Sequence, residues 1–81
     1  MQVRVCFYSY YKDLTGCAHV AATLPEGSTL DDLYGQVALR FPKLGAMRKS
    51  TLMAVGVDYQ DRSCVLKDGD EVSLFPPVQG G

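Results

Sequence analysis

The sequence is that of a small, nearly neutral protein with 81 residues, a net charge of −1 and 47% hydrophobic residues. This balance is typical of one small globular domain, and since a domain of this size buries only about 60% of its unfolded surface, we do not expect a large internal substrate pocket. No cluster of lysine and arginine indicates nucleic-acid binding, and no apolar run approaches the roughly 20 residues that span a membrane.

Two strands are predicted at the start of the chain. Residues 3–9 are rich in β-branched and aromatic residues, and the alternation of a strand places Phe7 towards the core and Tyr8 on the opposite face. A polar loop or single helical turn follows over residues 11–16. Residues 18–24 then repeat the period of two, so we expect an antiparallel hairpin.

The main helix is predicted over residues 28–41. Its apolar stripe follows steps of three and four: Leu30, Leu33, Val37 and Phe41. Either Ser28 or Thr29 caps its first turn, because each is followed three residues later by an aspartate. Gly35 costs this helix up to about 1 kcal/mol relative to alanine. Pro42 marks its end.

The remaining segments complete a sheet. Residues 51–57 predict a third strand followed by a tight reversal at Gly56, and residues 59–66 are irregular, with room for one short strand. Residues 71–75 predict the last strand, in which Val72 and Leu74 point inward and Ser73 and Phe75 outward. One helix on a mixed sheet of four to five strands buries both apolar stripes, so residues 1–75 are predicted to form an α+β, ubiquitin-like β-grasp domain.

The last six residues predict an extended C-terminal segment. Pro76 and Pro77 cannot donate to a β-ladder and hold the chain extended as it leaves the sheet. Gly80 and Gly81 have no side chains, so the segment that also includes Val78 and Gln79 is able to thread a narrow channel. A carboxylate at Gly81 becomes reactive once another enzyme activates it, for example as an acyl-adenylate. The competing interpretation is an ordinary frayed chain end.

This C-terminal pattern resembles a known family. The stretch DGDEVSLFPPVQGG, residues 68–81, looks like the signature of the MoaD/ThiS-type sulfur carriers, which include the small subunit of molybdopterin synthase. The resemblance implies that an activating enzyme of the ubiquitin-E1 type uses ATP to adenylate Gly81. Sulfur then replaces the adenylate to give a thiocarboxylate. In this scheme the chain itself binds no cofactor and no metal.

The resemblance also implies the partner and the acceptor. The C-terminal segment, threading with Pro76, Pro77, Val78, Gln79 and Gly80, inserts into the large subunit of molybdopterin synthase, within a heterotetramer. There it donates sulfur to cyclic pyranopterin monophosphate, and the chemistry belongs to the large subunit, which makes the small subunit non-catalytic. We expect neither a nucleic-acid partner nor a membrane.

A second group of residues is predicted to bind partners. Tyr8 and Phe75 are expected on the sheet face away from the helix, and with Tyr59 they resemble family residues at the large-subunit interface. Lys12 stands where family members often have arginine, which keeps the charge but loses the bidentate fork. The alternative is that these are scattered surface aromatic residues of the ordinary kind.

The three cysteines favour no metal site and no disulfide framework. Cys6, Cys17 and His19 could share the outer face of the sheet, but their spacing matches no zinc motif, and surface thiols with a solvated histidine are the favoured interpretation. Cys64 could carry a persulfide in principle. Irregular cysteine spacing and the lack of a signal-peptide pattern favour the cytoplasm.

Three alternatives remain open from the sequence. The same chemistry at Gly81 would suit a sulfur carrier for thiamine biosynthesis, cysteine biosynthesis or tRNA thiolation. A ubiquitin-like modifier would instead be conjugated to lysines through the same residue. An interaction module would never activate it.

Overall fold

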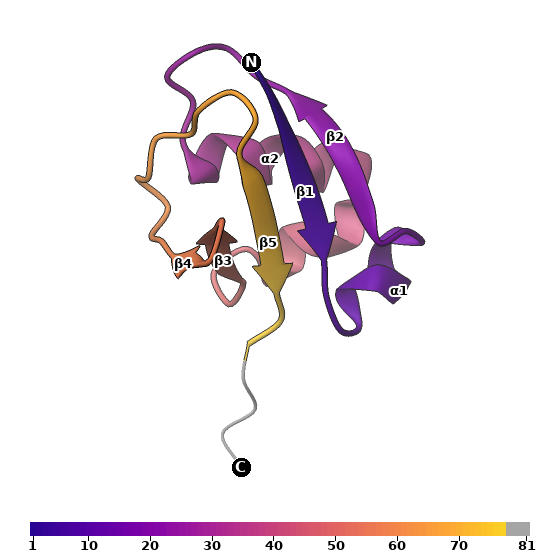
Figure 1. Cartoon of the computed structure of the whole chain (residues 1–81). Coiled ribbons are helices and arrows are strands. Elements are labelled where there is room, and N and C mark those ends of the chain that lie inside the picture. Colours follow the sequence, from indigo (N-terminus) through magenta and orange to yellow (C-terminus); the bar gives the residue numbers. More distant parts are fainter. Residues whose placement is uncertain (78–81) are drawn as a thin grey trace.

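A long helix lies across one face of a five-stranded sheet in the computed structural model, which describes residues 1–77 (Figure 1). The elements in chain order are β1 (Gln2–Phe7), α1 (Tyr11–Thr15), β2 (His19–Thr23), α2 (Leu30–Arg40), the 3-10 helix η1 (Pro42–Met47), β3 (Leu52–Val55), β4 (Asp58–Tyr59) and β5 (Glu71–Phe75). The strand order is β2-β1-β5-β3-β4, with β1 and β5 parallel and the other neighbours antiparallel. The predicted mixed sheet, hairpin and main helix are therefore confirmed. Within residues 1–77 no helix is long and apolar enough to cross a membrane.

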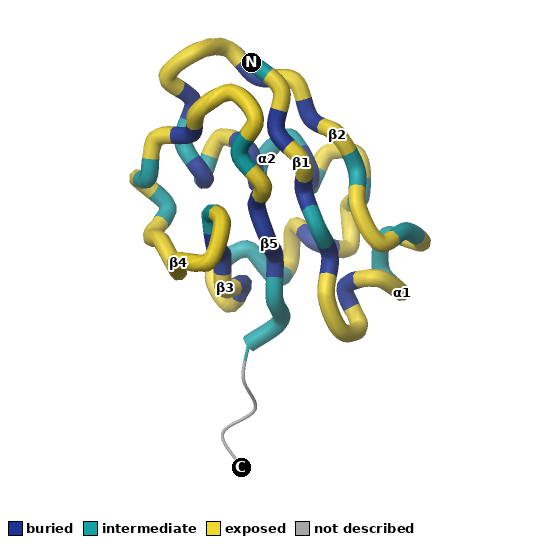
Figure 2. The backbone as a smooth tube through the Cα atoms, viewed as in Figure 1, coloured by how far each residue is buried: buried dark blue, intermediate teal, exposed yellow. Residues whose placement is uncertain are grey.

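The core lies between the inner face of the sheet and α2. Figure 2 shows buried positions alternating with more exposed ones along β1 and a nearly continuous buried stretch in β5, the central strand. The predicted inward residues are buried: Val3, Val5, Phe7, Val72 and Leu74. The helical stripe meets them as predicted, except that Phe41 is only half buried and packs edge-on against Phe7 at 5.6 Å. Burial of each such side chain stabilises the fold by about 1.5–3 kcal/mol.

Of the two predicted helix starts, the one at Thr29 is right. The Thr29 hydroxyl accepts from the Asp32 amide at 3.2 Å, and the Asp32 carboxylate accepts from the Thr29 amide at 3.0 Å. This capping box satisfies two amides that the helix itself cannot pair. Ser28 instead donates its hydroxyl to the Pro25 carbonyl at 2.7 Å, which closes the turn before the helix.

Two tyrosines belong to the core, although the sequence pattern did not select them. The expected loop or single helical turn is the short helix α1, which buries Tyr11 completely, and α2 buries Tyr34. Both hydroxyls lie within hydrogen-bond distance of the Thr51 hydroxyl, at 2.7 and 2.9 Å, and Tyr34 donates to the Leu44 carbonyl at 2.7 Å. The fold tolerates the burial of these rings because their polar ends are paired.

The second half of the sheet follows the predicted order. Gly56 adopts a φ of +62°, as the expected tight reversal requires, and leads into the two-residue strand β4. Ser73 lies on the outer face as predicted but is only 6% exposed. Ser73 lies on the central strand, with Cys6 opposite it in β1 and Ala54 opposite it in β3. These two neighbouring strands cover it from both sides.

Candidate functional site

The C-terminal ends of the neighbouring strands β1 and β5 lie side by side at one end of the sheet (Figure 1). Phe7 pairs with Leu74 in the parallel ladder, and the next amide, that of Tyr8, donates to the Leu74 carbonyl at 3.2 Å. This hydrogen bond holds Tyr8, the first residue after β1, beside the end of β5, whose last residue is Phe75. Pro76 and Pro77 then continue, half buried, beyond the strand.

Aromatic rings gather at this end of the sheet, on the face opposite α2. The Tyr8 and Phe75 rings stack with centroids 4.7 Å apart and planes 15° from parallel, and Tyr59 packs against Phe75 at 6.0 Å. The strand register explains the grouping, because Leu52 pairs with Phe75 across β3 and β5 and Ala54 pairs with Tyr59 across β3 and β4. We call Tyr8, Leu52, Tyr59 and Phe75 the aromatic surface.

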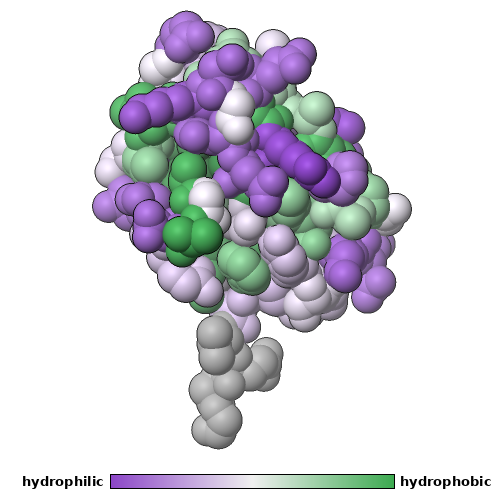
Figure 3. Space-filling model, in the orientation of Figure 1, coloured by the Kyte–Doolittle hydropathy of each residue, from purple (hydrophilic) through white to green (hydrophobic). Residues whose placement is uncertain are grey.

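The aromatic surface is exposed. Tyr8 is 40% accessible and Tyr59 67%, although stacked aromatic rings are usually covered. In Figure 3, strongly hydrophilic side chains cross the upper and middle part of this face, while pale and green ones surround the point where the described chain leaves the sheet. Exposed aromatic groups gathered at one place are typical of a surface that binds another protein.

The three predicted aromatic residues are thus brought together, and their role in partner binding stays a prediction. Leu52 was missed by sequence reasoning. The alternation of the LMAV strand could have placed it on the outer face, but only the β3–β5 register sets it opposite Phe75. Lys12 is exposed on α1, which follows directly after Tyr8, so its charge lies at the same end of the sheet as the aromatic surface.

The predicted reactive group and most of the threading residues lie outside the described residues: Val78, Gln79, Gly80 and Gly81. Their assignment stays a prediction, as does the division of the chain after residue 75. The observed geometry ends at Pro77 and concerns how the preceding strand is held and what surrounds its end.

The thiol and imidazole groups considered as metal ligands do not form one cluster within residues 1–77. Cys6 and His19 face each other across β1 and β2, but Cys17 packs against the hydrophobic core. Burial raises the pKa of the Cys6 thiol, and the nearby Glu71 carboxylate raises it further. Because the thiolate is the reactive form, this cysteine is a weak nucleophile.

Together, the strand order of the mixed sheet and the helix packed on it define a ubiquitin-like β-grasp fold. The family model described as the ThiS family matches residues 5–81, nearly the whole sequence. The chain belongs to the ThiS family.

Known proteins resemble the chain over its full length. It is 32% identical over 84 residues to the molybdopterin synthase sulfur carrier subunit of Chlamydomonas reinhardtii, with all of both chains covered. A structure described as molybdopterin converting factor subunit 1 from Pyrococcus furiosus shares 29% identity at a TM-score of 0.87, covering 96% of this chain and 99% of the other. A solved complex contains subunits 1 and 2 of molybdopterin-converting factor from Helicobacter pylori. One chain of this complex matches at 26% identity and a TM-score of 0.70, and the match covers all of this chain and all of that one.

Proposed function

We propose that the chain is the sulfur carrier subunit of molybdopterin synthase and that the Gly81 carboxylate carries the sulfur. The observation that carries this proposal is the end-to-end similarity to a molybdopterin synthase sulfur carrier subunit, in an alignment that extends over Gly80 and Gly81 of this chain. The geometry supports it, because a partner that covers the aromatic surface also meets the chain where it leaves β5.

The proposed chemistry needs two steps in other enzymes. The Gly81 carboxylate attacks the α-phosphate of ATP in an activating enzyme of the E1 type, which forms an acyl-adenylate and releases pyrophosphate. Sulfide then displaces AMP at the carbonyl carbon, leaving a thiocarboxylate. Activation is required because a free carboxylate is a poor acceptor for a nucleophile.

Sulfur transfer follows on the large subunit of the synthase. The C-terminal segment inserts into that subunit, within a heterotetramer, and the thiocarboxylate sulfur bonds to cyclic pyranopterin monophosphate. Water then cleaves the acyl carbon–sulfur bond, which leaves the sulfur on the pterin and returns Gly81 to a carboxylate. We propose that the small subunit contributes no catalytic side chain, binds no cofactor or metal, and acts in the cytoplasm. Its contribution is presentation: the β3–β5 ladder holds Phe75, and Pro76 and Pro77 keep the departing chain extended.

Intact-mass spectrometry tests this function. After incubation with ATP, sulfide and the activating enzyme, exchange of oxygen for sulfur at the terminus should add about 16 Da, as expected for acyl substitution. A variant that lacks Gly81 should show no gain and should not support molybdopterin formation. Its unfolding free energy should stay within about 0.5 kcal/mol of the wild type, because residues 1–77, which form the described sheet and core, are unchanged.

Three results would contradict the proposal. Molybdopterin formation with the truncated variant would exclude Gly81 as the reactive residue. Conversion to the thiocarboxylate without transfer on the large subunit would instead favour a carrier for another sulfur pathway, and isopeptide-linked products in cell lysates would favour a protein modifier.

A further inference from the structure

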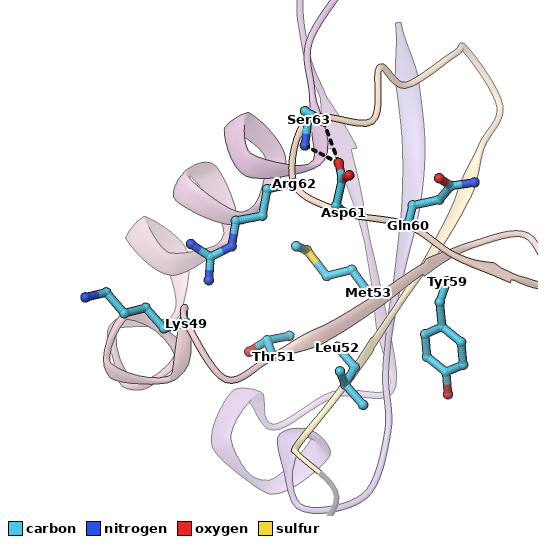
Figure 4. Close-up of a pocket in the computed structure, with 9 residues that line it drawn as sticks. All are labelled: Lys49, Thr51, Leu52, Met53, Tyr59, Gln60, Asp61, Arg62 and Ser63. Carbon is cyan, nitrogen blue, oxygen red and sulfur yellow. Dashed lines mark hydrogen bonds between the residues drawn. The ribbon is translucent and has the colours of Figure 1, made fainter.

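A groove of about 660 Å³ opens beside the aromatic surface, between the start of β3 and the chain that follows β4 (Figure 4). It forms because β4 is only two residues long. The last bond of this pairing runs from the Gln60 amide to the Met53 carbonyl at 3.0 Å. Beyond it the chain turns away from β3, and the Asp61 carboxylate fixes the turn by accepting from the Ser63 amide at 2.9 Å and from the Ser63 hydroxyl.

The two sides of the groove differ in chemistry. The exposed Leu52 and Tyr59 form an apolar side, whereas Lys49 and Arg62 supply basic side chains to the lining on the other side of the groove in Figure 4. Arg62 is held in position, because its guanidinium donates to the Arg48 carbonyl at 2.6 Å. Its remaining donors are geometrically suited to a carboxylate, which a guanidinium binds through two parallel hydrogen bonds.

The groove also contains one acidic residue, Asp61, whose carboxylate already accepts hydrogen bonds from Ser63. Its carboxylate points towards Ser63 rather than towards Arg62 in Figure 4, and the two hydrogen bonds from Ser63 lower its pKa. Asp61 therefore stays ionised and internally paired at neutral pH, and the two basic side chains are the groups that face an incoming ligand.

The groove is continuous with the aromatic surface, because Leu52 and Tyr59 belong to both. A partner that covers Phe75 and receives the C-terminal segment would extend over the groove without a gap. A continuous surface of this kind suits a protein segment, since protein interfaces combine a buried apolar centre with a polar rim. A small molecule is usually enclosed on most sides by its binding site. A channel between two diverging chain segments does not enclose a ligand in this way.

We propose that this groove binds a segment of the synthase large subunit in which an apolar side chain stands next to an aspartate or glutamate. The apolar side chain packs on Leu52 and Tyr59, and the carboxylate pairs with Lys49 and Arg62. The inference rests on the proposed function, because it takes the large subunit as the partner. It adds to the docking of the aromatic surface a second contact, an ion pair between the basic side chains of the groove and an acidic residue of the large subunit.

Charge reversal at Lys49 tests the groove. Lys49 is exposed and precedes β3, so Lys49→Glu should fold normally and leave the aromatic surface intact. The matched control is Lys67→Glu, an equal charge change in the turn whose Gly69 amide bonds to Gln2, at the opposite end of the sheet from Phe75. Lys49→Gln, which removes the charge without reversing it, is the milder second variant.

The measurements are the affinity of each variant for the purified large subunit at low and high salt, and the rate of thiocarboxylate formation by the activating enzyme. Lys49→Glu should weaken large-subunit binding about tenfold at low salt, Lys49→Gln less, and Lys67→Glu by no more than about twofold. High salt should reduce the difference because it screens the charge pair. Thiocarboxylate formation should be unchanged in all three.

Each other outcome overturns the inference in a distinguishable way. If the wild type binds the large subunit and Lys49→Glu binds as tightly as Lys67→Glu, the groove is not part of the interface, while the proposed function stands. If Lys49→Glu instead slows thiocarboxylate formation and leaves large-subunit binding intact, the occupant is the activating enzyme. If the large subunit fails to bind the wild type at all, the proposed function and this inference fail together.

Discussion

The two faces of the sheet have different roles: the inner face stabilises the fold, and the outer face is available for partner binding. On the inner face, Val5, Phe7 and Leu74 are sealed against α2, so every residue contributes to stability. On the outer face the centre carries short side chains such as Ser73 and Ala54, and the large rings are placed at the edge where β5 ends. A sheet covered on one side holds the fold with that side and leaves the other free for recognition.

The difference in burial teaches where a functional surface can be placed without loss of stability. A domain of 81 residues has a small core, so substitutions on the inner face should reduce stability, whereas substitutions on the outer edge should reduce partner binding and leave stability largely intact. Matched variants on the two faces separate these effects.

The largest effect on stability is expected from Leu33→Ala. Leu33 is 1% exposed at the centre of the apolar stripe of α2, and truncation of such a residue leaves a cavity that costs about 2–5 kcal/mol. Leu39→Ala is the matched control on the same helix, because Leu39 is 84% exposed and its truncation should stay within about 0.5 kcal/mol. Urea unfolding monitored by circular dichroism measures both. Equal losses for the two variants would show that α2 is not docked as described.

The outer edge should respond in the opposite way. Phe75→Ala removes the ring that both Tyr8 and Tyr59 contact, and the loss of a central aromatic anchor typically costs about 2 kcal/mol or more of binding free energy. Calorimetric titration with the large subunit should show this weakening, while the free energy of unfolding should change less than in Leu33→Ala because Phe75 is only partly buried. Wild-type affinity in this variant would exclude the aromatic surface from docking.

Much of the fold could be predicted from the sequence because its patterns are local. Alternation in residues 3–9 and the three-and-four spacing from Leu30 to Val37 each depend on near neighbours, and these elements formed as expected. Tyr34 also fits this spacing, four residues after Leu30 and three before Val37, so the pattern permits its burial. The partners of its hydroxyl could not be predicted in the same way, because Leu44 and Thr51 lie outside the helix.

The candidate site divides along the same line. Parity along a strand was enough to place Tyr8 and Phe75 on the outer face, but the stack between them depends on the parallel register of β1 and β5. The groove was not predicted at all, since Lys49 precedes β3 and Arg62 follows β4, and the two line one groove only because β4 ends after two residues.

A smaller loss of stability is expected from Tyr34→Phe. The change keeps the buried ring but removes the hydroxyl that donates to the Leu44 carbonyl and contacts Thr51, which should cost about 1–3 kcal/mol because a buried acceptor loses its partner. Tyr59→Phe is the matched control, because it removes the same hydroxyl from an exposed ring on the outer face and should change stability little. Urea unfolding of the two variants measures the difference.

The same variant gives a dependence on pH. Desolvation by burial raises the pKa of the Tyr34 hydroxyl, and likewise that of Tyr11. A folded-state pKa above the unfolded value of about 10 means that the stabilisation is complete below that pH and is lost as pH rises through the folded-state pKa. Tyr34→Phe should therefore lose less stability than the wild type between neutral pH and strongly alkaline pH. An equal loss would contradict the assignment of this titration to Tyr34.

The smallest effect, and the only gain, is expected from Gly35→Ala. A methyl group at this position would lie 3.6 Å from the Arg48 guanidinium, an ordinary van der Waals distance, so the helix should gain up to about 1 kcal/mol without a clash. Gly16→Ala is the control of opposite sign, because Gly16 ends α1 at a φ of +75° and alanine there should cost about 1–2 kcal/mol. Thermal unfolding of both variants measures the difference. A loss of stability in Gly35→Ala would instead mean that the Arg48–Asp31 ion pair, at 2.9 Å, needs the open space over the helix, and that α2 gives up intrinsic helix stability to hold the segment leading to the groove.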